Sequence, residues 1–152
     1  MRFLIQRVSH ASVQVEGQLV SQIQQGLLVL VGLGEGDCEA VFPKMIDKLI
    51  NLRIFDDEKG IPNNSVQNVG GGILLVSQFT LYADTKKGRR PSYTGALAPN
   101  LAAPLFDKLV ECISLQVPDL KVETGRFGAM MNVSSCNAGP YTLWLDSSQF
   151  AE

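Results

Sequence analysis

The sequence predicts an α+β fold in one domain. Strand patterns outnumber helical patterns, and two amphipathic helices are segregated among the strands instead of alternating with them. The length of 152 residues suits a single domain covering residues 1–152 and suffices to bury a substantial core. No repeat, linker or low-complexity segment divides the chain. These observations disfavour a doubly wound parallel sheet.

The N-terminal part of the chain predicts four strands. Residues 2–8 indicate a buried strand, and residues 11–15 alternate apolar and polar side chains as a second strand. A turn at residues 16–18 precedes an antiparallel return over residues 19–24. Residues 27–33 form a continuous apolar run, which is typical of a strand covered on both faces.

Two helices follow from apolar side chains that recur at helical spacing. Asp37 can cap the first helix, and Pro43 is expected in its first turn, where the missing N–H costs least. Pro118 ends the second helix. The stripes expected to be buried are Phe42, Met45, Ile46, Leu49 and Ile50 in the first helix, and Leu101, Leu105, Leu109, Cys112 and Ile113 in the second.

The remaining strands are separated by segments rich in turn-forming residues. Residues 56–72 and 83–99 are predicted to be long loops. Residues 137–140 indicate a hairpin connection between two strands. The strands expected around these segments cover residues 52–55, 73–82, 122–124, 129–136 and 141–146.

The composition favours a cytoplasmic protein without a membrane segment. The longest apolar run, residues 27–33, is far too short to span a bilayer, and the N-terminus does not resemble a signal peptide. The three cysteines are an odd number at wide spacing, so reduced thiols in a reducing compartment are expected.

A single histidine and a slightly acidic balance restrict the possible chemistry. His10 alone cannot build most zinc sites, so no metal and no cofactor are expected. Any Ser-His or Cys-His hydrolase would depend on this one imidazole, which has no visible acidic partner. The formal net charge of −2 disfavours a grip on a long phosphate backbone. Either nucleic acid is not a partner, or only a short end of it is held.

The first candidate site is the segment Ser77, Gln78, Phe79 and Thr80, followed by Leu81. Polar groups inside an apolar strand cost about 1–3 kcal/mol each when they lack a partner. One interpretation is that the hydroxyls simply face solvent or bond to the backbone. The other is that the strand end opens into a pocket, where hydroxyls, an amide and free backbone N–H groups can hold a developing oxyanion without histidine.

The second candidate is the segment from Asn137 to Thr142, which contains Gly139 and Pro140. From the residues alone it is a turn. A cis bond before proline costs only about 0.5–1 kcal/mol more than a trans bond, so a cis peptide is possible here.

The third candidate is the basic run formed by Lys86, Lys87, Arg89 and Arg90. Such a run is most often a solvated loop. Beside a pocket, it can instead contact the phosphates at the end of a nucleic acid, and nearby Tyr93 can stack on a base.

Taken together, the first two candidates resemble the two signature motifs of the D-aminoacyl-tRNA deacylase family in residues, order and separation. Either motif alone is only moderately specific, but the pair in a chain of family length is a strong signal. The likeness runs from Met1 to about Leu145. Further segments that resemble family sequence are Ile5–Val8, Gly26–Leu30, Arg53–Phe55, Arg90–Ser92 and Thr124–Phe127.

The resemblance implies strands curled into a barrel-like sheet, two helices packed outside it, and a twofold homodimer. In that family the Gly-Pro bond is cis, and each subunit inserts it into its neighbour's pocket. Carried over, Gly139 and Pro140 select chirality together with Asn137 and Thr142, and the Ser77–Leu81 segment forms the pocket wall.

The activity implied by the resemblance is hydrolysis of the ester bond of D-aminoacyl-tRNA, and also of Gly-tRNA. The partners are then the 3′-terminal adenosine, the D-amino acid and a second subunit. Because D and L isomers carry identical groups, geometry must separate them, and rigid main chain can exclude an L side chain where a soft pocket cannot. Glycine, without a side chain, is expected to pass.

Two mechanisms compete. Thr80 can act as a nucleophile, but a threonine hydroxyl needs a base and the sequence offers no obvious one. Alternatively, the 2′-hydroxyl of the terminal adenosine assists attack on the adjacent ester, while the protein supplies position and the N–H groups of Phe79 and Thr80. The second mechanism is favoured because it needs no histidine.

Two other functions stay open at this point. A sister deacylase with a trans Gly-Pro bond would clear L-alanine from mischarged tRNA, although Arg7 and Phe79 favour the D-specific branch. A nucleic-acid-binding module without catalysis would rely on the basic run, against which the net charge argues.

Overall fold

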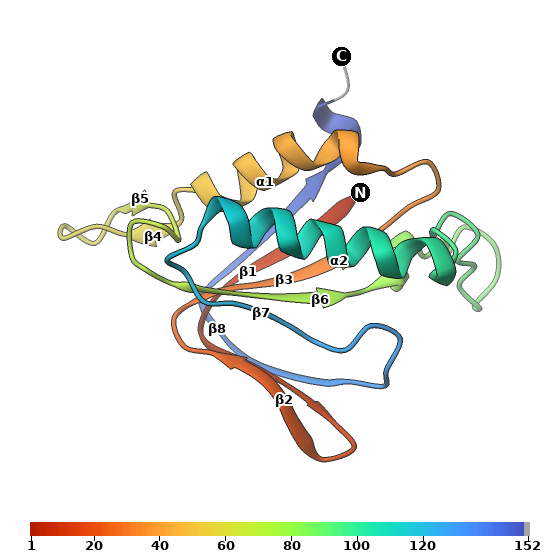
Figure 1. The fold of residues 1–152 in the computed structure, drawn as a ribbon, viewed down its shortest axis with the longest axis horizontal. Helices are drawn as coiled ribbons and strands as arrows, with labels where there is room; N and C mark the ends of the chain where they lie inside the picture. Colours follow the sequence, from red (N-terminus) through yellow and green to blue (C-terminus); the bar gives the residue numbers. More distant parts are fainter. Residues whose placement is uncertain (151–152) are drawn as a thin grey trace.

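The computed structural model describes residues 1–150 and has the predicted α+β architecture. A strongly curled, barrel-like sheet carries both α-helices on one side (Figure 1). In the main sheet, β1 pairs with β2 and β3 along one edge and with β8 along the opposite edge. Beyond β3 the order continues with β6 and β7. These strands are β1 (Arg2–Val15), β2 (Gln18–Ile23), β3 (Gly26–Gly32), β6 (Gly72–Ser77), β7 (Val122–Thr124) and β8 (Asn132–Asp146).

β1 is the central strand because it pairs along both edges. On one edge, residues 2–8 pair antiparallel with β3 and residues 11–15 pair antiparallel with β2. On the other edge, β8 follows β1 along nearly its whole length. The two strands predicted over residues 2–8 and 11–15 are therefore one continuous strand, whose first part pairs with β3 and whose second part pairs with β2.

The hairpin predicted at residues 137–140 is wrong. β8 is one strand, and both of its halves pair with β1. The register shifts between Gln6, which faces Thr142, and Val8, which faces Asn137. The turn-forming residues therefore form a local excursion from a continuous strand, and the chain does not reverse there.

The strand predicted over residues 73–82 is too long. β6 ends at Ser77, after pairing parallel with both β3 and β7. The following residues form a 3₁₀ helix, η2 (Phe79–Tyr82). The apolar run did not reveal this change, because a short apolar run does not distinguish a strand from a helical turn.

The strand predicted over residues 52–55 is also largely absent. Only β4 (Phe55–Asp56) forms, and it pairs with β5 (Pro62–Asn64) in a small hairpin apart from the main sheet. The loops predicted over residues 56–72 and 83–99 otherwise contain turns, with α2 beginning at Pro99.

Helix α1 (Phe42–Asn51) buries all five residues of its predicted stripe, and Pro43 lies in its first turn as expected. Asp37 does not cap this helix, which follows a short 3₁₀ helix, η1 (Glu39–Val41). The carboxylate of Asp37 instead accepts hydrogen bonds from the Gly34 N–H, at 2.7 Å, and from the amino group of Met1, at 2.5 Å.

Helix α2 (Pro99–Gln116) is rotated relative to its predicted stripe. Its buried residues are Ala102, Phe106, Leu109 and Ile113, whereas Leu101 is 56% exposed. Apolar side chains cover more than one face of this helix, so their spacing alone does not say which face meets the sheet. A last 3₁₀ helix, η3 (Ser147–Phe150), follows β8.

The apolar core has two parts. The larger lies between the helices and the sheet and includes Phe3, Val29, Met45, Leu49 and Leu109. The smaller gathers side chains of β1, β2, β3 and β6 that face the other way. Within residues 1–150, no helix is both long enough and apolar enough to cross a membrane.

Truncation of a core residue of α1 tests this packing. Leu49 is fully buried in the larger core, so Leu49→Ala is expected to lower the free energy of unfolding by about 2–5 kcal/mol. Leu115 of α2 is 73% exposed, and Leu115→Ala is expected to change it by less than about 0.5 kcal/mol. Urea denaturation measures both, and equal effects would contradict the assigned packing.

Candidate functional site

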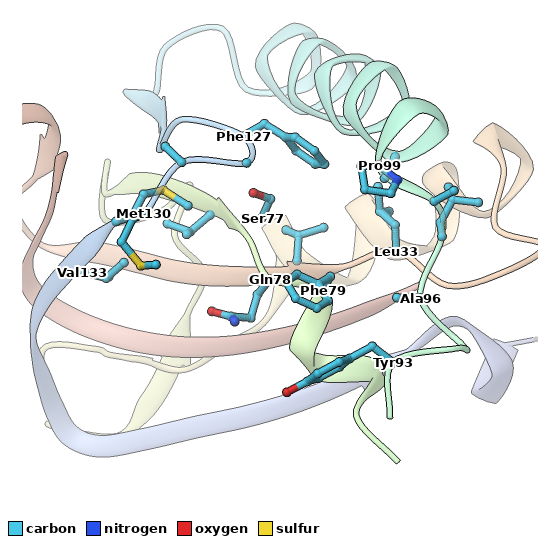
Figure 2. Close-up of a pocket in the computed structure, with 18 residues that line it drawn as sticks. Leu33, Ser77, Gln78, Phe79, Tyr93, Ala96, Pro99, Phe127, Met130 and Val133 are labelled. Atoms are coloured by element: carbon cyan, nitrogen blue, oxygen red, sulfur yellow. The ribbon is translucent and has the colours of Figure 1, made fainter. Parts of the chain in front are cut away.

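A cavity of about 620 Å³ opens where β3 and β6 end. Its walls come from the end of β6, the start of η2, the residues that lead into α2, and the loop between β7 and β8. Figure 2 shows Ser77 directed toward the loop that carries Phe127 and Met130, with Phe79 and Tyr93 on the opposite side. The structure thus gathers Ser77, Gln78 and Phe79 around one cavity.

The first turn of η2 follows β6 directly beside this cavity. The Gln78 N–H donates to the Val31 carbonyl at 2.7 Å, which holds the chain against β3 before η2 begins. The Leu81 N–H then donates to the Gln78 carbonyl, which closes the first turn of η2. The N–H groups of Phe79 and Thr80 lie inside that first turn, where carbonyls of the same helix cannot reach them. Such donors can stabilise a developing negative charge.

Thr80 occupies a different position from the other three predicted catalytic residues. It does not line the cavity, and its hydroxyl accepts a hydrogen bond from the side-chain amide of Gln78. The polar side chains of Gln78 and Thr80 are therefore hydrogen-bonded to each other.

A cluster behind η2 fixes its position. The Arg2 guanidinium donates to the Leu81 carbonyl at 2.9 Å and lies over the Tyr82 ring at 4.2 Å. The Tyr82 hydroxyl donates to the Asp37 carboxylate at 3.3 Å. Burial, reinforced by the charge of Asp37, raises the pKa of Tyr82 well above its usual value. Tyr82 is therefore a protonated donor at neutral pH and not a base.

The same arginine pairs with the end of β8. Its Nε donates to the Asp146 carboxylate at 3.0 Å. Partial burial tends to raise the pKa of Asp146, but hydrogen bonds from Ser148 and Arg2 outweigh it and leave the pKa below its usual range. Asp146 is therefore ionised at neutral pH, and the pair joins both ends of the chain to η2.

The cavity itself is apolar and has no acid–base pair. Within the described chain, its lining includes no Asp, Glu, His, Lys, Arg or Cys. His10 is exposed on β1, with its ring nitrogen next to the Ser9 hydroxyl. In residues 1–150, no three His, Cys, Asp or Glu side chains gather to hold a metal ion. The lining of this cavity therefore offers no carboxylate or imidazole that could act as a general base.

The second motif forms the excursion of β8. Residues 138–141 stand opposite Arg7, because the register shifts there. The Arg7 Nε donates to the Ala138 carbonyl at 2.9 Å, and its Nη1 donates to the Ile54 carbonyl at 2.6 Å. Its guanidinium also lies 4.8 Å from the centre of the Tyr141 ring. Arg7, whose side chain is largely buried, thus contacts the excursion at the Ala138 carbonyl and the Tyr141 ring.

Asn137 and Thr142 flank this excursion, and a hydrogen bond joins their side chains. The Asn137 side-chain amide donates to the Thr142 hydroxyl at 2.9 Å, and its oxygen accepts the Tyr141 N–H at 3.0 Å. Gln6 of β1 also donates to the Thr142 hydroxyl, at 3.2 Å. These side chains bind one another and the main chain, so their visible role is to fix the shape of the excursion.

The tip of the excursion is Gly139-Pro140, and the peptide bond between them is cis. Both residues are exposed. Gly139 has a φ of 132°, a region that L side chains rarely adopt, and an added Cβ would lie 3.0 Å from the Arg7 Nη2. Glycine is therefore favoured here by backbone conformation, and a larger residue would also displace the nearby guanidinium.

Within one chain the two motifs are far apart. Ser77 faces Val31 of β3, whereas Arg7, beside Gly139, faces Leu27 of the same strand. Val31 and Leu27 lie about 13 Å apart along β3, and three strand spacings of about 4.8 Å separate β6 from β8. Gly139 and Pro140 do not line the cavity of their own chain.

The basic run lies on an exposed loop beside the cavity. Backbone hydrogen bonds between Asp84 and Ser92, of 2.7 and 2.9 Å, close this loop at its base. The four basic residues within it, Lys86, Lys87, Arg89 and Arg90, are all exposed.

The candidate residues predicted from the sequence do not include those of the cavity wall across from Ser77. That wall includes Phe127, Ala129 and Met130 from the loop after β7, Leu97 from the segment before α2, and Pro99, the first residue of α2. The Thr124–Phe127 segment resembles family sequence, which was the one available signal. Its distance along the chain from Ser77 gave no reason to place it at the same site.

Comparisons with known proteins agree with this geometry. The family described as D-Tyr-tRNA(Tyr) deacylase matches residues 4–146. A D-aminoacyl-tRNA deacylase of Thermomicrobium roseum is 55% identical over 150 residues, covering 98% of this chain and 96% of the relative. One of Roseiflexus sp. is 53% identical over 152 residues, covering 100% and 97%.

Two solved structures share the fold. One is titled c-Myc DNA Unwinding Element Binding Protein and has a TM-score of 0.91 at 35% identity, covering 96% of this chain and 98% of that one. The other is titled as a probable eukaryotic D-amino acid tRNA deacylase, with a TM-score of 0.80 at 19% identity over 95% and 97% of the chains. The second shows the fold alone.

These full-length matches make the chain a deacylase, and hence a hydrolase. It belongs to the D-Tyr-tRNA(Tyr) deacylase family. The family resemblance seen in the two motifs is therefore confirmed.

Removal of the Asn137 side chain tests whether its hydrogen bonds fix the shape of the excursion. In Asn137→Ala the Tyr141 N–H loses its acceptor, so hydrogen exchange of that amide is expected to accelerate about tenfold. Asn137→Asp keeps the accepting oxygen and is the matched control. Unchanged exchange in the alanine variant, measured by NMR, would contradict this role.

Proposed function

We propose that this protein hydrolyses the ester bond of D-aminoacyl-tRNA, and of Gly-tRNA, releasing the amino acid and free tRNA in the cytoplasm. The observation that carries the proposal is an apolar cavity whose lining holds no acid–base pair and includes Phe79, the first residue of η2. The substrate class is that named for curated relatives 50–55% identical to this chain. No cofactor is required for this reaction.

The catalytic groups are the backbone of the Ser77–Thr80 segment and the substrate's own 2′-hydroxyl. The N–H groups of Phe79 and Thr80 hold the oxygen on which negative charge develops, an interaction that is typically worth about 2.7–4 kcal/mol per donor. The 2′-hydroxyl of the terminal adenosine assists water in attacking the neighbouring ester carbonyl. Water's oxygen ends in the carboxylate, and the tRNA leaves with its hydroxyl restored. Ser77 and Gln78 position the substrate.

The alternative, Thr80 as a nucleophile, has little support. The Thr80 hydroxyl already accepts a hydrogen bond from Gln78, and an accepted hydrogen bond does not remove its proton. A hydroxyl nucleophile needs an adjacent base, and the cavity lining supplies none.

Chiral selection comes from a second copy of the chain. Gly139 and Pro140 are exposed and lie far from the cavity of their own subunit. In a twofold homodimer, the excursion of one subunit enters the cavity of the other, and its carbonyl oxygens accept the substrate's ammonium hydrogens. The D side chain then points to solvent, while an L side chain would collide with main chain. Asn137 and Thr142 keep this main chain rigid.

The basic loop contacts the acceptor end of the tRNA. Lys86, Lys87, Arg89 and Arg90 are exposed beside the cavity, where they meet phosphates. Because only this end is held, the net charge of −2 is compatible with an RNA substrate.

A sister activity, removal of L-alanine from tRNA, is the second candidate. The family resemblance links it to a trans Gly-Pro bond, whereas the Gly139-Pro140 bond of this chain is cis. The solved structure titled as a DNA-binding protein keeps a non-catalytic nucleic-acid-binding role as a third candidate. The net charge and the apolar cavity argue against that role.

Hydrolysis of D-Tyr-tRNA separates the two mechanisms. Thr80→Ala keeps the backbone N–H groups, so we expect it to retain most of the wild-type kcat/KM. A substrate that ends in 2′-deoxyadenosine is expected to lose at least about a hundredfold. If instead the variant is inactive and the deoxy substrate is hydrolysed normally, Thr80 is the nucleophile.

Enlargement of Gly139 tests the chirality filter. Gly139→Ala is expected to abolish turnover of D-Tyr-tRNA while the protein remains folded, because the strain is confined to an exposed excursion. Gly60→Ala is the matched control, since Gly60 also has positive φ, at 74°, but open space around it. Thermal melting and a deacylation assay report on both variants. A Gly139→Ala protein that unfolds would show that the turn is structural.

Parallel assays with L-Ala-tRNA and D-Tyr-tRNA test the choice of substrate. We expect hydrolysis of the D substrate and rejection of the L substrate by at least about a thousandfold, since main chain cannot yield as a soft pocket does. Efficient hydrolysis of L-Ala-tRNA would identify the sister activity instead.

A further inference from the structure

Two aromatic rings stand exposed at the rim of the cavity. Phe79 is 57% exposed and Tyr93 is 38% exposed. Their ring centres lie 5.0 Å apart at an interplanar angle of 70°, an edge-to-face arrangement. Figure 2 shows the two side chains next to each other. An edge-to-face pair leaves ring faces that the partner ring does not cover. The proposed hydrolysis uses only the backbone of Phe79 and does not use Tyr93.

The main chain around Tyr93 is fastened to the end of β3. The Ala96 N–H donates to the Tyr93 carbonyl at 3.0 Å, and the Leu97 N–H donates to the Leu33 carbonyl at 2.9 Å. The Glu35 N–H donates to the Gly95 carbonyl, also at 2.9 Å. Tyr93 therefore projects from a held backbone, and a partner that stacks on it orders little additional chain.

Positive charge lies directly beside this aromatic pair. The loop with four exposed basic residues ends at Ser92, whose backbone is paired with Asp84. Aromatic rings next to a basic groove are the usual means by which proteins hold single-stranded nucleic acid, the rings stacking on bases while the cations meet phosphates.

We propose that Phe79 and Tyr93 form a stacking site for the base of the penultimate nucleotide of the substrate's single-stranded 3′ end. The inference rests on the proposed function, in which the terminal adenosine occupies the cavity. The preceding nucleotide then leaves the cavity over its rim, where the two rings lie. Its phosphate continues toward the basic loop. Stacking requires only the face of a base, so the site contributes affinity without selecting among tRNAs.

The test combines a protein change with a substrate change. Tyr93→Ala is compared with wild type on D-Tyr-tRNA and on the same tRNA with the penultimate base removed and its sugar and phosphate kept. On the intact substrate, Tyr93→Ala is expected to lower kcat/KM by about 5- to 100-fold, mainly through KM, as expected for one lost base stack. Removal of the base is expected to lower the wild-type value by a similar factor. Tyr93→Phe keeps the ring and should match wild type.

The two losses are not expected to add. On the abasic substrate, Tyr93→Ala should be no worse than wild type, because the interaction is already absent. Additive losses, or no loss on the intact substrate, would overturn the stacking site. Failure of the wild-type protein to hydrolyse the intact D-Tyr-tRNA would instead count against the proposed function.

Discussion

The pairing of β8 with β1 is the constraint on which the arrangement of the site depends. It places both halves of β8 on the same edge of β1, so the residues between Asn137 and Thr142 must leave the sheet as an excursion. Arg7 supports this excursion through the Ala138 carbonyl, and a Cβ added at Gly139 would lie 3.0 Å from its guanidinium. The same sheet carries Ser77 two strands beyond β1, at the far end of β3. Within one chain, the excursion therefore does not line the cavity.

The lining of the cavity includes no imidazole, and the proposed hydrolysis needs none. Its lining is apolar apart from Ser77, Gln78 and the Tyr93 hydroxyl, so hydrogen bonds made within it are weakened little by water. Its donors belong to the backbone of η2, whose position is set by Arg2, Tyr82 and Asp37. In the proposed mechanism no side chain of the lining changes its protonation state, and reactivity depends on geometry and on the substrate's own hydroxyl.

Local sequence patterns predicted the elements better than their boundaries. The stripe of α1 was correct in every residue because it is the only apolar face of that helix, whereas α2 has several and was rotated. The hairpin at residues 137–140 was wrong because turn-forming residues also suit an excursion, and only the non-local pairing with β1 distinguishes the two. The cavity wall at Ser77, Gln78 and Phe79 was predicted, but the Phe127–Met131 part required contacts between distant segments. The family motifs supplied the cis bond at Gly139-Pro140, which no spacing argument singles out.

The most direct test asks whether the turn of one subunit serves the cavity of another. Gly139→Ala damages the turn and leaves the cavity intact, and Ser77→Phe fills the cavity and leaves the turn intact. Each variant alone should be inactive, whereas co-expressed and randomly assembled subunits should recover about a quarter of wild-type D-Tyr-tRNA hydrolysis, since half of the twofold dimers then hold one complete site. Mixed subunits that associate but stay inactive would contradict the account.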